Sequence, residues 1–285
     1  MAQIYFDEDE LRRGKFFEIP DVIRGDDRKG YEIGEWLGRG GNGSVFACYE
    51  TTTGDAYAIK FLLLTGYAVT RRFQREAQLM KRVKHEHVVS LITSGTAQAT
   101  NVQRRLPFII MERADHNLSE AIKKAGVRFA PEVYIGQFRG LVGGLAAMHA
   151  LAIHRDIKPE NILVSGDRWL LGDYGLCKFI ARSTEEISGD RLVQGPRFWL
   201  SPEVQNRRVG NDDEISPASD VYQLAAVFWY VATGRHPSGI LGEQDWQGPA
   251  WLFPPLFRAL QHGLARRPVD GTAFAEAIEH SIHPN

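Results

Sequence analysis

The 285-residue sequence lacks several features that mark specialised classes of protein. Its only two cysteines, Cys48 and Cys177, lie far apart and show no metal-ligand spacing, so we expect neither a disulfide framework nor a zinc site. The 34 Lys and Arg residues nearly balance the 35 Asp and Glu residues, and a net charge of −1 gives no global attraction to nucleic acid or to anionic membranes. Because neither cysteine is expected in a disulfide or a zinc site, both are interpreted as small apolar residues of a protein in a reducing cytoplasm.

Long apolar segments and a secretory leader are also missing. Even residues 221–232, one of the most apolar stretches, are too short to span a bilayer. The first ten residues do not show the basic-then-apolar order of a signal peptide, and there is no internal repeat. These absences predict a cytoplasmic location without a membrane span. They leave open whether the chain is complete or part of a longer protein.

The most informative segment is residues 154–161, which reads His-Arg-Asp-Ile-Lys-Pro-Glu-Asn and is followed by Asp173-Tyr174-Gly175. Phosphoryl transfer needs an acceptor for the proton of the attacking hydroxyl, a positive neighbour for the moving charge, and oxygen ligands for Mg²⁺. The carboxylate, ammonium and amide groups of this loop and turn could supply all of these. The segment therefore predicts phosphoryl transfer.

Three further motifs occur in a fixed order around this segment. A glycine-rich stretch covers residues 38–45, Tyr-Ala-Ile-Lys covers residues 57–60, and Ser-Pro-Glu covers residues 201–203. The glycine-rich stretch alone is weak evidence, and a dinucleotide-binding turn is excluded because residues 44–49 continue as a strand rather than a helix. From about residue 30 onward, the ordered motifs resemble the eukaryotic-type (Hanks-type) serine/threonine protein kinase family, in its bacterial branch.

The resemblance implies catalytic and metal-binding roles. Asp156 would accept the proton of a substrate hydroxyl, and Lys158 would steady the γ-phosphate. Lys60 would bind the α- and β-phosphates and pair with Glu76 on the following helix. The implied ligands of Mg²⁺, for which Mn²⁺ could substitute, are Asn161 and Asp173.

The resemblance also implies a site for ATP. Glycines 38, 40 and 43 would let main-chain N–H groups approach the phosphates, although a plain hairpin turn would have the same composition. The residues implied around the nucleotide are Leu37, Gly38, Gly40, Gly43, Val45, Ala58, Lys60, Met111, Glu112, Ala114 and Leu163. Main-chain groups of Glu112 and Ala114 would bind the adenine edge.

Strand-like segments precede helix-like segments, which predicts an α+β, bilobal kinase-like fold. We expect an extension at residues 1–29, a lobe with an antiparallel sheet and one helix at 30–113, and a helical lobe at 114–285. The strands are expected at 31–37, 44–50, 56–63, 88–94 and 107–112. The helices are expected at 69–83, 118–125, 131–151, 217–233, 254–264 and 272–281.

The family resemblance also assigns structural residues. Glu203 and Arg267 match a buried ion pair, Asp220 matches an anchor of the catalytic loop, and His154 matches a core residue that stacks on Tyr174. Arg155 would pair with a phosphate on the loop that follows, unless that loop is constitutively ordered or Glu185, Glu186 and Asp190 already supply its negative charge. The candidate phosphorylation positions in this loop are Ser183, Thr184 and Ser188.

One position departs from the serine/threonine pattern. Pro196 stands where a Thr usually links the catalytic Asp and Lys, unless Ser201 or a shifted register replaces that Thr. Pro196 and Trp199 also resemble the tyrosine kinase branch. Lys158 still favours serine or threonine hydroxyls of a protein substrate. The alternatives are an ATP-binding pseudokinase scaffold and a small-molecule kinase, and the ion pair that closes residues 195–203 argues against the latter.

Overall fold

The computed structural model describes residues 1–40, 43–126, 129–180 and 197–283. The chain forms two compact units, one of residues 1–82 and 89–114 and the other of residues 83–88 and 115–285. The first is rich in strands and the second in helices, which confirms the predicted α+β class.

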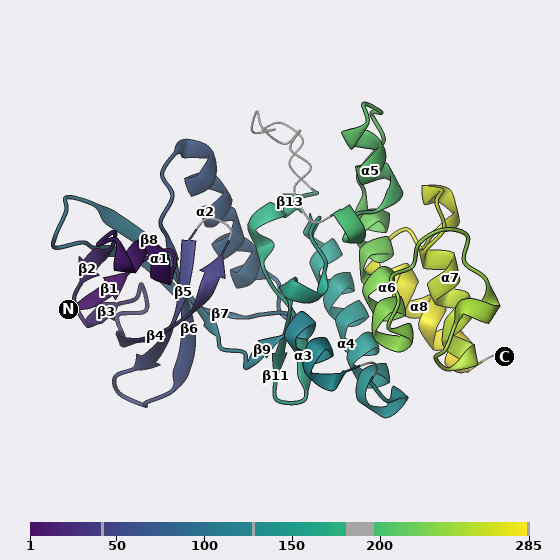
Figure 1. The fold of residues 1–285 in the computed structure, drawn as a ribbon, viewed down its shortest axis with the longest axis horizontal. Coiled ribbons are helices and arrows are strands. Elements are labelled where there is room, and N and C mark those ends of the chain that lie inside the picture. The colour runs from purple at the N-terminus through teal and green to yellow at the C-terminus, as the bar shows by residue number, and fades with distance from the viewer. Residues whose placement is uncertain (41–42, 127–128, 181–196, 284–285) are drawn as a thin grey trace. The chain divides into compact units, whose positions relative to one another are not determined.

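The sheet unit is built on a six-stranded antiparallel sheet with the order β3-β4-β5-β6-β8-β7 (Figure 1). A separate antiparallel pair, β1-β2, precedes it. The elements of this unit are β1 (Ala2–Ile4), α1 (Glu8–Arg12), β2 (Phe17–Ile19), β3 (Val22–Arg24), β4 (Gly30–Gly40), β5 (Gly43–Glu50), β6 (Ala56–Leu62), α2 (Tyr67–Arg82), β7 (Leu91–Gln98) and β8 (Arg105–Glu112).

The core of the sheet unit is aromatic. Phe61 lies between Phe46 and Phe108, with edge-to-face ring centroids 6.2 and 5.9 Å apart. Such pairs add stability beyond the area that they bury. Ile4 and Ile19, on β1 and β2, are fully buried in the same cluster, so the N-terminal extension is part of this core.

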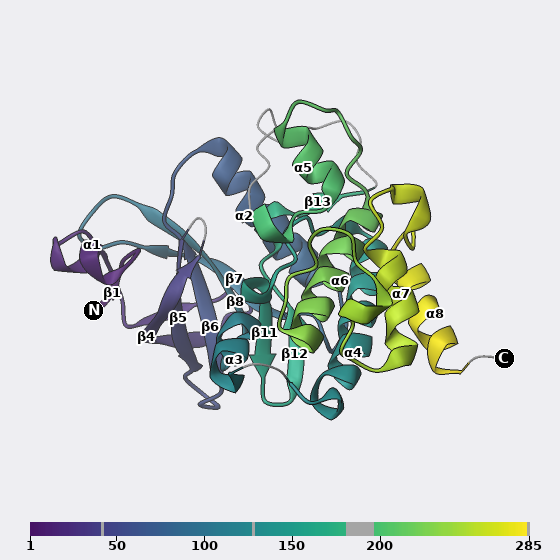
Figure 2. The ribbon, with the colours of Figure 1, turned by 45° about the vertical axis from the view of Figure 1, so that its right-hand side comes forward.

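The helix unit contains two small sheets and the main helices, of which α4, α6 and α8 pack together (Figure 2). Its elements are β9 (His116–Asn117), α3 (Leu118–Ala125), α4 (Pro131–His149), β10 (Ala152–Ile153), β11 (Ile162–Ser165), β12 (Arg168–Leu171), β13 (Lys178–Phe179), α5 (Pro202–Arg208), α6 (Pro217–Thr233), α7 (Phe253–Ala259) and α8 (Gly271–Ile282).

Helix α6 forms the centre of the helix unit, and its limits follow from local chemistry. Ser216 and Ser219 form a capping box, Pro217 occupies the first turn, and Gly234 ends the helix with φ of 69°. Phe228 of α6 stacks on Phe138 of α4 with ring centroids 3.7 Å apart. The helix thus presents fixed polar side chains to the loops around it.

Residues 83–88, which we call the 83–88 strip, belong to the helix unit although they follow α2 in the chain. The Nδ1 atom of His87 lies 2.8 Å from the carbonyl oxygen of Trp169, and Val88 pairs with Leu171. A Cβ on Gly140 of α4 would lie 2.1 Å from His87 Nε2, so only glycine leaves room for this imidazole.

Two predicted elements were misplaced. The strand expected at 88–94 is found at Leu91–Gln98, because Val88 pairs within the helix unit instead. The helix expected at 254–264 ends at Ala259, and a short 3₁₀ turn occupies residues Leu264–Arg266. Helix α5 was not predicted, although Pro202 in its first turn is a typical start signal.

Candidate active site

The loop of residues 154–161 is held together by its own side chains. Asp156 is only 7% exposed, and its Oδ2 atom accepts hydrogen bonds from Lys158 Nζ and Asn161 Nδ2, each at 2.8 Å. Asn161 Nδ2 also donates to the main-chain oxygen of Asp156 at 2.8 Å. The three side chains therefore occupy one place in the helix unit, as their spacing in the sequence predicts.

Burial changes the acidity of the central carboxylate. It raises the pKa of Asp156 above the ordinary value of 3.8, while the hydrogen bond and charge of Lys158 act in the opposite direction. A carboxylate with a raised pKa accepts a proton more readily than an exposed one. The loop thus combines a buried base with an adjacent cation.

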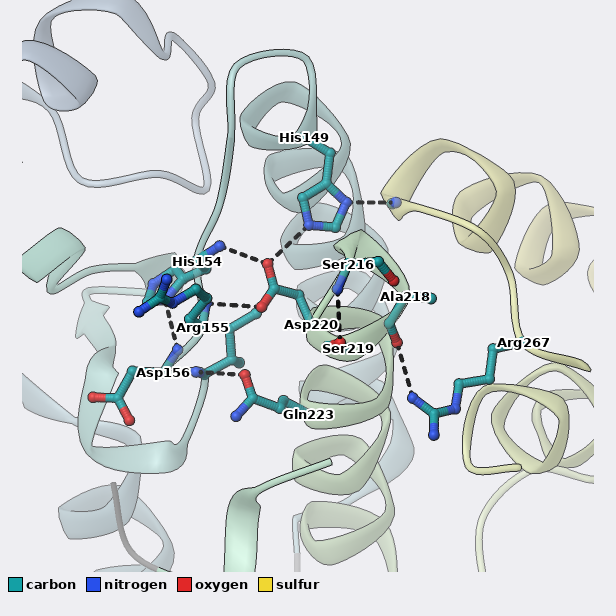
Figure 3. Close-up of polar contacts among 12 residues, drawn as sticks. His149, His154, Arg155, Asp156, Ser216, Ala218, Ser219, Asp220, Gln223 and Arg267 are labelled. Carbon is teal, nitrogen blue, oxygen red and sulfur yellow. Dashed lines mark hydrogen bonds and ion pairs between the residues drawn. The ribbon is translucent and has the colours of Figure 1, made fainter. Parts of the chain in front are cut away.

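The main chain of the loop is anchored from α6 (Figure 3). Asp220 Oδ2 accepts a hydrogen bond from the main-chain nitrogen of His154 at 2.6 Å, and Asp220 Oδ1 accepts one from that of Arg155 at 2.8 Å. Arg155 has φ of 73°, a conformation that is strained for a residue with a side chain. The predicted anchoring role of Asp220 is therefore confirmed.

Two further residues of this network were not predicted. Gln223 Oε1 accepts a hydrogen bond from the main-chain nitrogen of Ile157 at 3.2 Å. His149 Nε2 lies 3.0 Å from Asp220 Oδ2, and its Nδ1 atom accepts the N–H of Gly271 at 2.9 Å (Figure 3). Since Nδ1 is an acceptor, Nε2 carries the proton and donates to the carboxylate. Only the spacing of Gln223 one helical turn after Asp220 gave a signal in the sequence.

His154 is a core residue, as predicted. Its side chain is fully buried, and its ring lies 5.9 Å from that of Tyr174. His154 Nδ1 lies 3.3 Å from the main-chain nitrogen of Asp156, and Nε2 lies 3.0 Å from the carbonyl oxygen of Gly172. Both ring nitrogens therefore serve to shape the loop and the turn after β12.

The turn at Asp173 has an unusual main-chain conformation. Asp173 has φ of 54°, is exposed, and accepts a hydrogen bond from Gly175 N at 3.3 Å. A positive φ at a non-glycine residue is a strain that functional turns often carry. The oxygens of Asp173 and Asn161 suit Mg²⁺, which takes few protein ligands and completes its shell with phosphates and water.

A second group of predicted residues lies in the sheet unit. Lys60, in the middle of β6 and 7% exposed, donates from Nζ to Glu76 Oε1 of α2 at 2.6 Å. This confirms the predicted pair and satisfies a charge that would otherwise be costly to bury. A Cβ on Gly40 would lie 3.3 Å from Lys60 Cε, so the end of β4 passes directly over the lysine.

The residues predicted around the adenine lie on both units. Val45 on β5 is paired with Lys60, and Ala58 on β6 is paired with Met111 on β8. The amide of Glu112 donates to the carbonyl oxygen of Ser90 at 3.1 Å. Leu37, Gly38, Gly43 and Ala114 also belong to the sheet unit, whereas Leu163 lies on β11 of the helix unit. Their contact with a nucleotide stays a prediction.

A buried ion pair ties α5 to the segment before α8. Arg267 Nη1 and Nη2 each lie 3.0 Å from one oxygen of Glu203, and the guanidinium also donates to the carbonyl oxygens of Gln261 and His262. Burial acts to raise the pKa of Glu203, but the hydrogen bonds and charge of Arg267, together with hydrogen bonding from nearby hydroxyls such as that of Ser219, outweigh it and lower that pKa. The predicted pair is confirmed.

Ser201 does not take the place of the missing Thr. It is fully buried, and within the described ranges its hydroxyl makes no hydrogen bond to Asp156 or Lys158. Pro196 and the candidate phosphorylation positions Ser183, Thr184 and Ser188 lie outside the described residues, as do Gly41 and Asn42 of the glycine-rich stretch.

The two cysteines behave as predicted. Both are buried, and burial raises the pKa of the Cys48 thiol to about 12.

Among residues 1–40, 43–126, 129–180 and 197–283, no cluster of three His, Cys, Asp or Glu side chains could hold a metal ion by itself. Within the same ranges, no helix combines the length and apolar character needed to cross a bilayer.

Two groups of predicted residues are thus found: a lysine–glutamate pair beside a glycine-rich strand end in the sheet unit, and an Asp-Lys-Asn loop with a strained Asp turn in the helix unit. The protein kinase domain family matches residues 31–247, and the chain belongs to this family.

Bacterial serine/threonine-protein kinases are among the similar proteins. The chain is 30% identical over 213 residues to the probable serine/threonine-protein kinase PknB of Corynebacterium glutamicum, which covers 73% of this chain and 32% of that protein. It is 31% identical over 212 residues to the serine/threonine-protein kinase PknB of Mycobacterium tuberculosis. This match covers 73% of this chain and 33% of that protein. The chain therefore spans about a third of the length of these curated relatives.

Proposed function

We propose that this protein transfers the γ-phosphoryl group of ATP to serine or threonine hydroxyls of protein substrates. The observation that carries the proposal is the buried Asp156 carboxylate, which is held by Lys158 and Asn161 at 2.8 Å each. A base, a cation and an amide fixed at one point suit phosphoryl transfer, in which positioning and charge neutralisation supply most of the acceleration.

The reaction assigns a task to each group. The substrate hydroxyl oxygen attacks the γ-phosphorus in line with the bond to the β-γ bridging oxygen, which breaks and leaves ADP. The hydroxyl proton passes to Asp156, whose raised pKa suits it to accept a proton. Lys158 holds positive charge beside the transferred group while negative charge spreads over its oxygens.

Asn161 and Asp173 would hold Mg²⁺. When bound, this ion neutralises charge on the β- and γ-phosphates. The hydrogen bonds from Asn161 Nδ2 to Asp156 turn the amide nitrogen towards the base, which leaves Asn161 Oδ1 as the oxygen suited to a hard cation. The left-handed conformation of Asp173 presents its carboxylate at the surface of the helix unit.

In the sheet unit, Lys60 would bind the α- and β-phosphates, and Glu76 would keep its ammonium group in place. The glycine positions 38, 40 and 43 would bring main-chain N–H groups to the phosphates. A Cβ on Gly43 would lie 1.7 Å from the carbonyl oxygen of Phe61, so this position accepts only glycine. Within this unit the adenine would lie against Val45 and Ala58.

Two observations separate this proposal from its alternatives. A scaffold without turnover has no need of the complete set Lys60, Asp156, Asn161 and Asp173. The bidentate pair of Glu203 and Arg267 supports a protein substrate rather than a small molecule, because it braces the segment that a protein kinase uses beside its substrate. The serine/threonine names of the relatives and Lys158 support the choice of hydroxyl.

The test is incubation of the purified protein with γ-labelled ATP and Mg²⁺, with a generic protein substrate present. We expect labelled phosphoserine or phosphothreonine from the wild-type protein, and none from Asp173→Ala or after removal of divalent metal with EDTA. Asp167→Ala, at an exposed turn between β11 and β12, is the matched control and should retain transfer. ATP binding without transfer to any substrate would contradict the proposal and favour the scaffold.

A further inference from the structure

Residues 1–29 are folded onto the sheet unit rather than trailing from it. Strands β1 and β2 pair in register from Ala2 with Ile19 to Ile4 with Phe17, and β3 adds to the edge of the main sheet beside β4 (Figure 1). Because β1 and β2 share the core of the sheet, any contact from this extension to the glycine-rich stretch has a rigid base.

Three consecutive residues after β1 contact the β4-β5 hairpin. The ring of Tyr5 lies edge-to-face on Phe46 at 5.3 Å, and 6.2 Å from the ring of Trp36. The guanidinium of Arg39 lies 5.1 Å from the centre of the Phe6 ring. Asp7 Oδ2 lies 3.3 Å from Arg39 Nη1, while Asp7 Oδ1 caps helix α1 by accepting the N–H of Glu10 at 2.9 Å.

Arg39 stands inside the glycine-rich stretch, between Gly38 and Gly40 and opposite Ser44 in the β4-β5 register. Gly40 faces Lys60, as the 3.3 Å approach of its Cβ position to Lys60 Cε requires. Successive residues of a strand point to opposite faces, so Arg39 points away from the lysine. The extension therefore contacts the glycine-rich end of β4 on the face opposite to the predicted phosphate site.

Next to these contacts, two hydrogen bonds join β4 and β5. Trp36 Nε1 donates to Ser44 Oγ at 2.7 Å, and Ser44 Oγ donates to the carbonyl oxygen of Gly38 at 3.4 Å. Glycine-flanked strand ends are easily deformed because glycine has little conformational preference. Even weak contacts can then decide which conformation is populated.

We infer that Asp7 and Arg39 are positioning residues for ATP: their ion pair, seated on Phe6, holds the end of β4 in the conformation that receives the phosphates. The inference rests on the proposed function. It assigns the N-terminal extension a part in nucleotide binding through contacts of Tyr5, Phe6 and Asp7 with the β4-β5 hairpin. It also keeps the charge of Arg39 turned away from that site.

Asp7→Asn is the most selective test, because Asn caps a helix as well as Asp and so preserves α1. We expect the Kd and the KM for ATP to rise roughly two- to five-fold, as suits the loss of a partly exposed ion pair, with kcat nearly unchanged. Amide hydrogen exchange of the apo protein should become faster in a peptide that covers residues 36–46. Arg39→Gln should act alike, and the double variant should be no worse than either single variant.

Asp9→Asn is the matched control, since Asp9 lies on the same helix and pairs only loosely with Arg12 at 3.6 Å among the described residues. It should leave the Kd, KM and exchange unchanged. Unchanged or tighter ATP binding in Asp7→Asn, unchanged hydrogen exchange, or additive effects of the two substitutions would each overturn the inference while leaving the proposed function intact. A wild-type protein that binds no ATP would overturn both.

Discussion

The carboxylate of Asp220 accepts the main-chain N–H of His154 at 2.6 Å, although 66 positions separate the two residues in the chain. The same carboxylate accepts the N–H of Arg155, whose main chain is strained, and the Nε2 proton of His149. One buried side chain on α6 thus determines the conformation of the loop that carries Asp156.

Replacing this anchor should impair both folding and transfer. Asp220→Asn keeps the shape of the side chain but turns one acceptor into a donor, which leaves at least one buried N–H without a partner. We expect a loss of about 1–3 kcal/mol in the free energy of unfolding, measured with urea. The rate of phosphoryl transfer should fall by up to about 10²-fold, because the base is displaced. Asp245→Asn, at an exposed short turn, is the control, and wild-type values for Asp220→Asn would contradict the role.

The rate of transfer should depend on pH through Asp156. The base must be ionised to accept a proton, and burial raises its pKa above 3.8. We therefore expect kcat/KM to fall on the acidic side, with a midpoint above the ordinary aspartate value. The measurement is the initial rate of transfer from pH 4 upward at saturating Mg²⁺, with far-UV circular dichroism to confirm folding. An acidic limb centred at or below 3.8 would contradict the effect of burial.

The same raised pKa predicts how stability varies with pH. A carboxyl group whose pKa is higher in the folded state stabilises that state below its unfolded pKa, and this contribution is lost as the pH rises through the folded pKa. Asp156→Asn does not titrate. The variant should therefore be at least as stable as the wild-type protein at pH 7, and its advantage should shrink as the pH is lowered towards 4. A destabilised variant at pH 7 would show that Lys158 outweighs burial.

The ion pair of Glu203 and Arg267 should be worth far more than an exposed pair. Glu203→Gln would leave a guanidinium with a fully buried side chain without its counter-charge, and we expect a loss of about 3–5 kcal/mol in urea unfolding. Asp212→Asn is the matched control, because its pair with Arg207 is at the surface and the Asp212 side chain is 98% exposed. Equal effects of the two substitutions would contradict the distinction.

Helices with local start and stop signals could be predicted from the sequence. The limits of α3 and α6 follow from Asn117 and Ser216 before them and from the glycines that end them. The helix expected at 254–264 was too long, because Arg267 binds the carbonyl oxygens of Gln261 and His262 and turns the chain there. Helical periodicity carries no information about such contacts between a side chain and the main chain.

The residues of the candidate site were likewise predictable from the sequence only where local spacing brings them together. Asp156, Lys158 and Asn161 lie within one short loop, so their spacing in the sequence brings them together. The contribution of Asp220 could be anticipated only from the resemblance to kinases, since nothing local links it to His154. His149 was missed because its two partners, Asp220 and Gly271, come from separate helices.

The 83–88 strip affects how truncated forms of the protein should be made. The helix unit consists of two separate stretches of the chain. A truncated protein that begins at residue 115 would therefore lack part of the interior of this unit. Gly140 would then face solvent where the imidazole of His87 normally sits, and Trp169 would lose its hydrogen-bond donor. To express the helix unit on its own, residues 83–88 would have to be joined to residues 115–285, for instance by circular permutation.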